Sequence, residues 1–213
     1  MPNFIGDSIN TIPAIELIRQ VFPQARITLL GPSFLKELFE YDPRIFYVIV
    51  SNKRKKNYFR NIFVILRNRY DLGILFTNTF MTALLLRLAL VKRLVGYENE
   101  GRGFLLNFKR PLNRNVHYIN RYAMLVNEWL GNKFTCLPTL KLYYKQECNF
   151  HFANNNPVIG LYLGGTNKRF RRYPEEQAIV LLRMLRNYNL VFIGDSNDAV
   201  VQSSYVRQAM IDN

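Results

Sequence analysis

Cysteine, histidine and acidic residues are all scarce in this chain of 213 residues. It contains two cysteines, two histidines, and 15 aspartates and glutamates together. Two cysteines are too few for a disulfide scaffold, and neither they nor the histidines have the spacing of a metal site. Cys136 and Cys148 are interpreted as reduced thiols, with a disulfide between them as the alternative. The sequence therefore predicts neither a bound metal nor a cofactor.

Long apolar runs are missing as well. A helix that crosses a membrane needs about 20 consecutive apolar residues, and Arg87 interrupts the most apolar window, 84–91. Asp7, Ser8 and Asn10 interrupt the apolar residues near the start, so no signal peptide is recognised there. We therefore expect neither a membrane span nor a secretion signal.

Positive charge and aromatic mass are what the chain has in excess. Its 29 lysines and arginines give a net charge of +14, and it holds 16 phenylalanines and 13 tyrosines. This aromatic content, with 49% hydrophobic residues, is typical of a folded globular protein and excludes a disordered basic tail. The charge predicts an anionic partner.

Helical and strand patterns alternate along the chain. Helical spacing of apolar residues predicts helices over 8–22, 34–39, 58–69, 81–91, 117–130, 174–186 and 198–211. Short apolar runs predict strands over 26–31, 45–50, 71–76, 93–96, 157–163 and 190–194, and a polar loop is expected up to residue 115. This alternation favours an α/β fold with a mainly parallel sheet and helices on both of its faces.

Three regions follow from this pattern. We expect a Rossmann-like domain over residues 1–140, a linker over 141–156 and a second Rossmann-like unit over 157–213. Two strands and two helices do not bury both faces of a sheet, and only Met1 precedes the first strand-to-helix turn. The chain is therefore interpreted as a fragment without its first strand and with a partial second domain.

Segment 3–8, at the head of the first helix, is the first candidate site. In open parallel sheets, ligands bind where strand ends meet helix N-termini. Gly6 permits a close approach of the backbone, and Asp7 is a candidate general base. Asp is also a favoured N-cap residue, so a purely helix-capping role for Asp7 is the alternative.

Segment 163–174 is the second candidate site. It follows a predicted strand, leads into a helix, and combines two glycines, a hydroxyl and four cations, which is the chemistry of a phosphate or diphosphate site. The candidate residues are Gly164, Gly165, Thr166, Lys168, Arg171 and Arg172. The spacing matches neither a P-loop nor a dinucleotide fingerprint. A solvated basic loop is the alternative.

Segment 51–70 has seven cations and no acidic residue. It is interpreted as a solvated helix face, with an anionic membrane surface and nucleic acid as alternatives. The membrane interpretation uses Lys53, Arg54, Lys55, Lys56 and Arg60. No nucleic-acid-binding motif is present, and the aromatic residues of this segment are expected in the core.

The chain resembles glycosyltransferase family 9, whose heptosyltransferases transfer heptose from ADP-heptose to the lipopolysaccharide inner core. Its nearest resemblance is to the members that act on the first heptose of that core. The segments that carry the resemblance follow one another in the family's order and are 2–7, 70–84, 96–107, 117–122, 164–174 and 191–194.

The resemblance implies a GT-B architecture, in which the N-terminal domain holds the acceptor and the C-terminal domain holds the nucleotide sugar. It implies inverting, metal-independent transfer with Asp7 as the general base. Thr166 and Arg171 match the family's phosphate-binding positions. Asn78, Thr79 and Thr82 match its acceptor-side loop, beside Gly6.

The implied partners are ADP-heptose, an inner-core glycolipid and the cytoplasmic surface of the inner membrane of a Gram-negative bacterium, with no nucleic acid. Residues 1–150 carry a charge of +12 (22 cations, 10 acids), which suits an anionic acceptor. The family's later donor-binding Asp-Ser/Thr-Gly-x-x-His segment has no counterpart. We therefore expect an inactive or incomplete form. The alternatives are another GT-B nucleotide-sugar transferase and a non-catalytic, membrane-peripheral anion-binding remnant.

Overall fold

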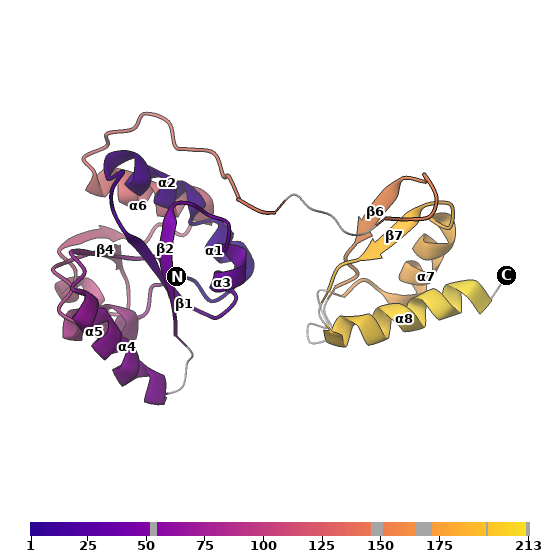
Figure 1. The fold of residues 1–213 in the computed structure, drawn as a ribbon, viewed down its shortest axis with the longest axis horizontal. Coiled ribbons are helices and arrows are strands. Elements are labelled where there is room, and N and C mark those ends of the chain that lie inside the picture. Colours follow the sequence, from indigo (N-terminus) through magenta and orange to yellow (C-terminus); the bar gives the residue numbers. More distant parts are fainter. Residues whose placement is uncertain (52–54, 146–150, 165–171, 195, 212–213) are drawn as a thin grey trace. The chain divides into compact units, whose positions relative to one another are not determined.

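A computed structural model gives the structure of residues 1–51, 55–145, 151–164, 172–194 and 196–211. The chain divides into two units, which are described separately: unit 1 is Met1–Gln146 and unit 2 is Glu147–Asn213 (Figure 1). None of the helices in these ranges is long and apolar enough to cross a membrane.

Unit 1 contains two parallel sheets. Strands β1 (Ile27–Gly31) and β2 (Ile45–Val50) form one, and β3 (Leu72–Leu75), β4 (Arg93–Glu98) and β5 (Phe108–Pro111) form the other in that order. The helices of this unit are α1 (Ile5–Ile9) and α2 (Ile12–Val21) before β1, then α3 (Leu35–Leu38), α4 (Lys55–Asn68), α5 (Phe80–Leu88) and the 3₁₀ turn η1 (Arg102–Leu105) between strands, and α6 (Tyr118–Trp129) after β5.

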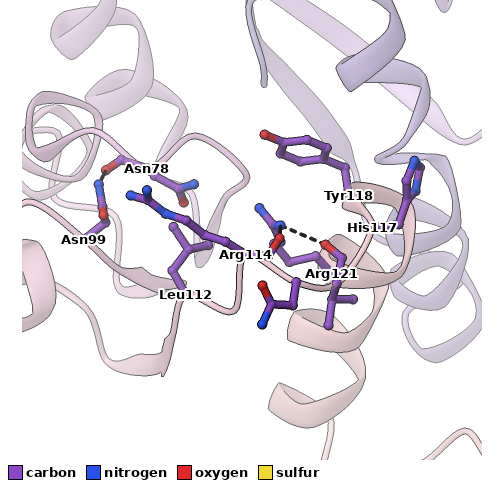
Figure 2. Close-up of a pocket in the computed structure, with 9 residues that line it drawn as sticks. Asn78, Asn99, Leu112, Arg114, His117, Tyr118 and Arg121 are labelled. Atoms are coloured by element: carbon purple, nitrogen blue, oxygen red, sulfur yellow. Dashed lines mark hydrogen bonds between the residues drawn. The ribbon is translucent and has the colours of Figure 1, made fainter.

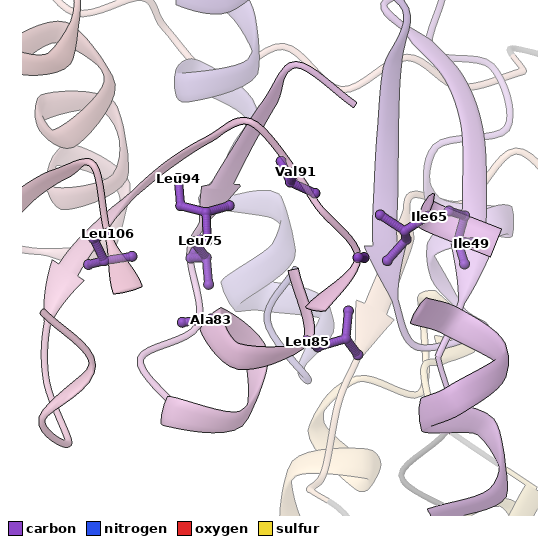
Figure 3. Close-up of a cluster of buried hydrophobic side chains, with 9 residues drawn as sticks. Ile49, Ile65, Leu75, Ala83, Leu85, Val91, Leu94 and Leu106 are labelled. Carbon is purple, nitrogen blue, oxygen red and sulfur yellow. The ribbon is translucent and has the colours of Figure 1, made fainter. Parts of the chain in front are cut away.

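Helices cover both faces of the β3–β4–β5 sheet, as the alternating pattern predicts. On one face, Leu94 of β4 joins a buried cluster with Ile65 of α4 and Leu85 of α5 (Figure 3). On the other face, its neighbour Val95 packs with Leu125 of α6. Successive residues of a strand point to opposite faces, so one apolar strand supports two cores.

Unit 2 repeats the pattern on a smaller scale. Strands β6 (Val158–Leu161) and β7 (Asn189–Phe192) are parallel, and α7 (Glu175–Met184) and α8 (Ser196–Ile211) pack on each other. Their shared core includes Leu163, Ala178, Leu182, Tyr205 and Ala209.

Two expected elements are wrong. Residues 8–22 do not form one helix, because α1 ends at Ile9 and α2 begins at Ile12, with Pro13 in its first turn. Proline has no N–H to donate and is favoured where a helix starts. The polar loop expected up to residue 115 contains η1 and β5. Strand β5 is mostly exposed and pairs through its main chain with β4, so no apolar pattern reveals it.

Side-chain burial differs from the expectation in helix α4. Phe59 and Phe63 are exposed, although the aromatic residues of this segment were expected in the core. The core-facing side of the helix is formed by Asn61, Ile62 and Ile65. Cys136 is a free, exposed thiol, and Cys148 lies outside the described residues.

Candidate functional site

An open pocket of about 620 Å³ lies at the carboxyl ends of β3, β4 and β5, where they meet the start of α6. The described residues that line it are Asn78, Asn99, Leu112, Arg114, Asn115, Val116, His117, Tyr118 and Arg121. Figure 2 shows Asn78, Asn99 and Arg114 on one side and His117, Tyr118 and Arg121 on the other. This lining offers amides and cations and no carboxylate, which suits a polar ligand with anionic groups.

Arg102 organises the loops on the β3–β4 side of this pocket. Its side chain is fully buried, and Nη1 donates to the Thr77 carbonyl at 2.6 Å while Nε donates to the Tyr97 carbonyl at 2.9 Å. Nη2 reaches Oδ1 of Asn78 at 3.4 Å. Burial lowers the pKa of Arg102 to about 10, and the charge of Glu100 opposes that shift. The guanidinium stays charged near pH 7, so it holds the strand-end loops through charge-assisted bonds.

Arg121 forms part of the opposite wall. It is only 5% exposed, and Nη2 donates to the Arg114 and Val116 carbonyls at 3.1 and 2.8 Å. Its Nε has no hydrogen-bond partner among the described residues. A buried, unpaired N–H on a cation is costly.

Asp7 lies in the first turn of α1 and does not line the pocket. Its charge contributes to raising the pKa of Tyr122 to about 12, although burial is the larger cause. The Tyr122 ring is 6.0 Å from that of Tyr118, which lines the pocket. The carboxylate makes no hydrogen bond or ion pair with the described residues. The N-cap of α1 is Phe4, so the interpretation of Asp7 as the N-cap is wrong.

The predicted acceptor-side residues have different roles in the structure. Asn78 lines the pocket, and its carbonyl accepts a bond from Asn99 Nδ2 at 3.1 Å. Thr82 is used within the loop, because its hydroxyl donates to the Thr79 carbonyl at 2.8 Å and contacts the Thr79 hydroxyl at 3.1 Å. Gly6 is exposed, and an added Cβ would have no neighbour within 4 Å. Their acceptor-side role stays a prediction.

Two of the predicted phosphate-binding residues, Gly164 and Arg172, lie within the described part of unit 2. Gly164 has a φ of 88°, which favours glycine. The N–H of Tyr173, beside Arg172, donates to the carbonyl of Leu163 at 2.9 Å, so Gly164 and Arg172 flank one hydrogen bond. Arg172 Nε donates to the Tyr205 hydroxyl at 2.9 Å, which ties this arginine to the core. Gly165, Thr166, Lys168 and Arg171 lie outside the described residues.

The start of α7 carries its own negative charge. Pro174 is its N-cap, and Glu175 and Glu176 occupy the first turn. These carboxylates already complement the positive end of the helix dipole. The helix N-terminus alone is therefore not evidence for an anion site, and diphosphate binding by segment 164–172 stays a prediction.

The basic segment is described only in part. Lys53 and Arg54 lie outside the described residues, and Lys55 and Lys56 begin α4. Arg60 is exposed on the same helix. Among the side chains that the structure describes, no three His, Cys, Asp or Glu residues gather as metal ligands, and metal-independent transfer stays a prediction.

Sequence reasoning missed Arg102 and Arg121 as site residues. Both lie in segments that carry the family resemblance, 96–107 and 117–122, and that was the only signal available. A buried arginine that bonds to carbonyls has no distinctive local pattern, so its role emerges from the tertiary contacts alone.

Comparison with known proteins gives a consistent result. Residues 60–210 match the family described as glycosyltransferase family 9 (heptosyltransferase). The chain is 22% identical to lipooligosaccharide heptosyltransferase 2 of Haemophilus ducreyi, over 94% of this chain and 63% of that protein. It therefore spans less than two thirds of this relative's length.

Solved structures share the fold. The structure of E. coli ADP-heptose lipopolysaccharide heptosyltransferase II has a TM-score of 0.82 at 21% identity, over 97% of this chain and 66% of that one. E. coli heptosyltransferase WaaC with ADP-2-deoxy-2-fluoro heptose has a TM-score of 0.69 at 14% identity, over 97% and 70%. These similarities confirm the predicted α/β, GT-B type of fold.

Proposed function

Because the chain belongs to glycosyltransferase family 9, the heptosyltransferase family, we propose that it transfers heptose from ADP-heptose to the inner core of lipopolysaccharide. The observation that carries the proposal is the family match over residues 60–210, which includes the lining of the pocket and segment 164–172. The similar E. coli protein is an ADP-heptose heptosyltransferase by name, and this supports the same donor here.

The proposed reaction is a single inverting displacement. An acceptor hydroxyl oxygen attacks the anomeric carbon of heptose, Asp7 takes the hydroxyl proton, and the bond from that carbon to the ADP oxygen breaks. Asp7 suits this role because no described hydrogen bond or ion pair occupies its carboxylate. The charge that develops on ADP needs stabilisation, which we assign to Gly164, Gly165, Thr166, Lys168, Arg171 and Arg172.

The pocket of unit 1 is the proposed acceptor site. Asn78 and Asn99 offer amides to sugar hydroxyls, and the guanidinium groups of Arg114 and Arg121 offer charge to a phosphate or carboxylate. Anionic groups of this kind are recognised best by guanidinium side chains. The pocket therefore fits a phosphorylated or acidic core oligosaccharide better than a neutral one.

An acceptor of this class is a glycolipid, so the protein is proposed to work in the cytoplasm at the inner membrane surface. The excess charge of unit 1 supports this location rather than a nucleic-acid partner. The chain spans about 63% of the length of its Haemophilus ducreyi relative. We therefore propose that these 213 residues alone catalyse heptose transfer slowly at most.

Binding and turnover test the proposal together. A phosphorylated, heptose-terminated core oligosaccharide is titrated calorimetrically into the wild-type chain, Asp7→Asn and Arg114→Gln. We expect equal affinity for wild type and Asp7→Asn, and about tenfold weaker binding for Arg114→Gln. Arg93→Gln, at an exposed arginine outside the pocket lining, is the control.

Heptose transfer is then followed by mass spectrometry of the acceptor. Any transfer by the wild type should disappear in Asp7→Asn. The proposal fails if the wild type binds neither the oligosaccharide nor ADP-heptose, or if the wild type transfers heptose and Asp7→Asn transfers it equally fast. Faster transfer from another nucleotide sugar than from ADP-heptose would show that the protein is a GT-B transferase with a different donor.

A further inference from the structure

Helix α4 has an apolar stripe that faces away from the core of unit 1. Phe59, Phe63 and Leu66 are 77%, 65% and 38% exposed. Their spacing of i, i+4 and i+7 places them on one line along the helix. The core is contacted by a different line, represented by Ile65 in Figure 3. The exposed stripe is therefore not needed to bury the helix.

Cations border this stripe. Arg60 and Arg67 are exposed and seven residues apart, so they form a line parallel to the aromatic one. The sequence around them, 51–70, contains seven cations and no acid. In Figure 1, α4 lies at the edge of unit 1. Large aromatics with adjacent arginines on one exposed helix face indicate an interaction surface.

The charge selects the occupant. We propose that this stripe docks unit 1 on an anionic lipid bilayer, with Phe59, Phe63 and Leu66 at the boundary between headgroups and acyl chains. Arg60 and Arg67 then contact lipid phosphates. Apolar residues on one side of a helix and cations beside them are the composition of interfacial helices. A second copy of the chain would bring two such cationic segments together, which like-charge repulsion opposes.

This inference extends the membrane association in the proposed function by assigning it to one helix. It does not depend on sugar transfer. A wild-type chain that binds lipid vesicles but transfers no heptose would contradict only the proposed reaction. A wild-type chain that binds the acceptor but not the vesicles would contradict only the docking surface.

The test is co-sedimentation of the 213-residue chain with vesicles. Vesicles of phosphatidylglycerol and phosphatidylcholine are compared with vesicles of phosphatidylcholine alone. Phe59→Ser/Phe63→Ser removes the centre of the stripe. The matched control is Val180→Ser/Met184→Ser on α7, an exposed apolar pair with the same i, i+4 spacing, 54% and 73% exposed, that follows two glutamates. Thermal unfolding checks that each variant is folded.

We expect the wild type to bind the anionic vesicles strongly and the neutral ones weakly. Phe59→Ser/Phe63→Ser should lower partitioning at least about tenfold, whereas the α7 control should not change it. Arg60→Gln/Arg67→Gln should lower it by about 25-fold at low salt, since each cation near an anionic surface contributes about fivefold.

Three results would overturn the proposal. The first is unchanged vesicle binding by folded Phe59→Ser/Phe63→Ser. The second is equal binding to neutral and anionic vesicles. The third is a wild-type dimer in sedimentation velocity that this variant converts to monomer, because the stripe would then be an interface between copies.

Discussion

The hydroxyl of Tyr97 donates a 2.6 Å hydrogen bond to the main-chain carbonyl of Arg121. This bond joins β4 to α6 from inside the protein, since both side chains are buried. The side chain of Arg121 forms the pocket wall, so a strand that does not itself line the pocket determines where that wall lies. The site is therefore positioned by a buried polar contact as well as by apolar packing.

Replacing Tyr97 by Phe should destabilise unit 1 by about 1–2 kcal/mol, because a buried carbonyl loses its donor. Urea unfolding followed by circular dichroism measures the change. Tyr41→Phe, at an exposed tyrosine, should be neutral. Stability equal to wild type in Tyr97→Phe would show that water replaces the hydroxyl without cost.

Alkaline pH should destabilise the protein through Tyr97 and Tyr122. Burial raises the pKa of each to about 12, assisted by the charge of Glu128 for Tyr97 and of Asp7 for Tyr122. Between pH 10 and 12 the unfolded chain loses these protons and the folded chain keeps them, so stability falls as pH rises.

Urea midpoints from pH 8 to 11 test this dependence, together with tyrosinate absorbance. Tyr122→Phe should remove part of the slope and leave the remainder to Tyr97. A midpoint that is constant over this range, or a Tyr122→Phe slope equal to that of the wild type, would contradict the assignment.

Arg102→Gln should affect stability and acceptor binding together. The substitution removes charge-assisted bonds to the Thr77 and Tyr97 carbonyls, and we expect a loss of about 3 kcal/mol with weaker oligosaccharide binding. Urea unfolding and calorimetry measure the two effects. Arg93→Gln, at an exposed arginine that begins β4, is the control. Unchanged acceptor affinity in folded Arg102→Gln would show that the loops held by Arg102 do not position the acceptor site.

Gly6→Ala separates ligand approach from folding. The added methyl group meets no atom within 4 Å, and alanine favours the helix by about 0.5–1 kcal/mol. Stability should therefore be equal or higher, while acceptor binding or transfer falls at least tenfold if substrate approaches this backbone. Gly131→Ala is a contrasting variant, because its φ of 79° makes a side chain unfavourable there. A fully active Gly6→Ala would place the acceptor elsewhere.

The buried strands and the helix ends were largely predictable. Strands β1 and β2 lie within one residue of the expected ranges, because continuous apolar and β-branched runs favour strands. The helix expected over 117–130 is α6 (Tyr118–Trp129), and Gly131 follows its end with the positive φ that glycine permits. Strand β5 was not predictable, because main-chain pairing with β4 holds it and its side chains carry little pattern.

The sequence by itself determined the alternation of strands and helices, the excess of positive charge and the family, because these depend on local composition and order. Tertiary structure decided which charges remain available. Arg102 and Arg121 are buried against carbonyls, and Arg44 pairs with Asp42, whereas Arg60 and Arg114 are exposed. It also decided that Ile65 rather than Phe63 contacts the core. A helical repeat shows which residues share a line, but only packing against another element selects the line that is buried.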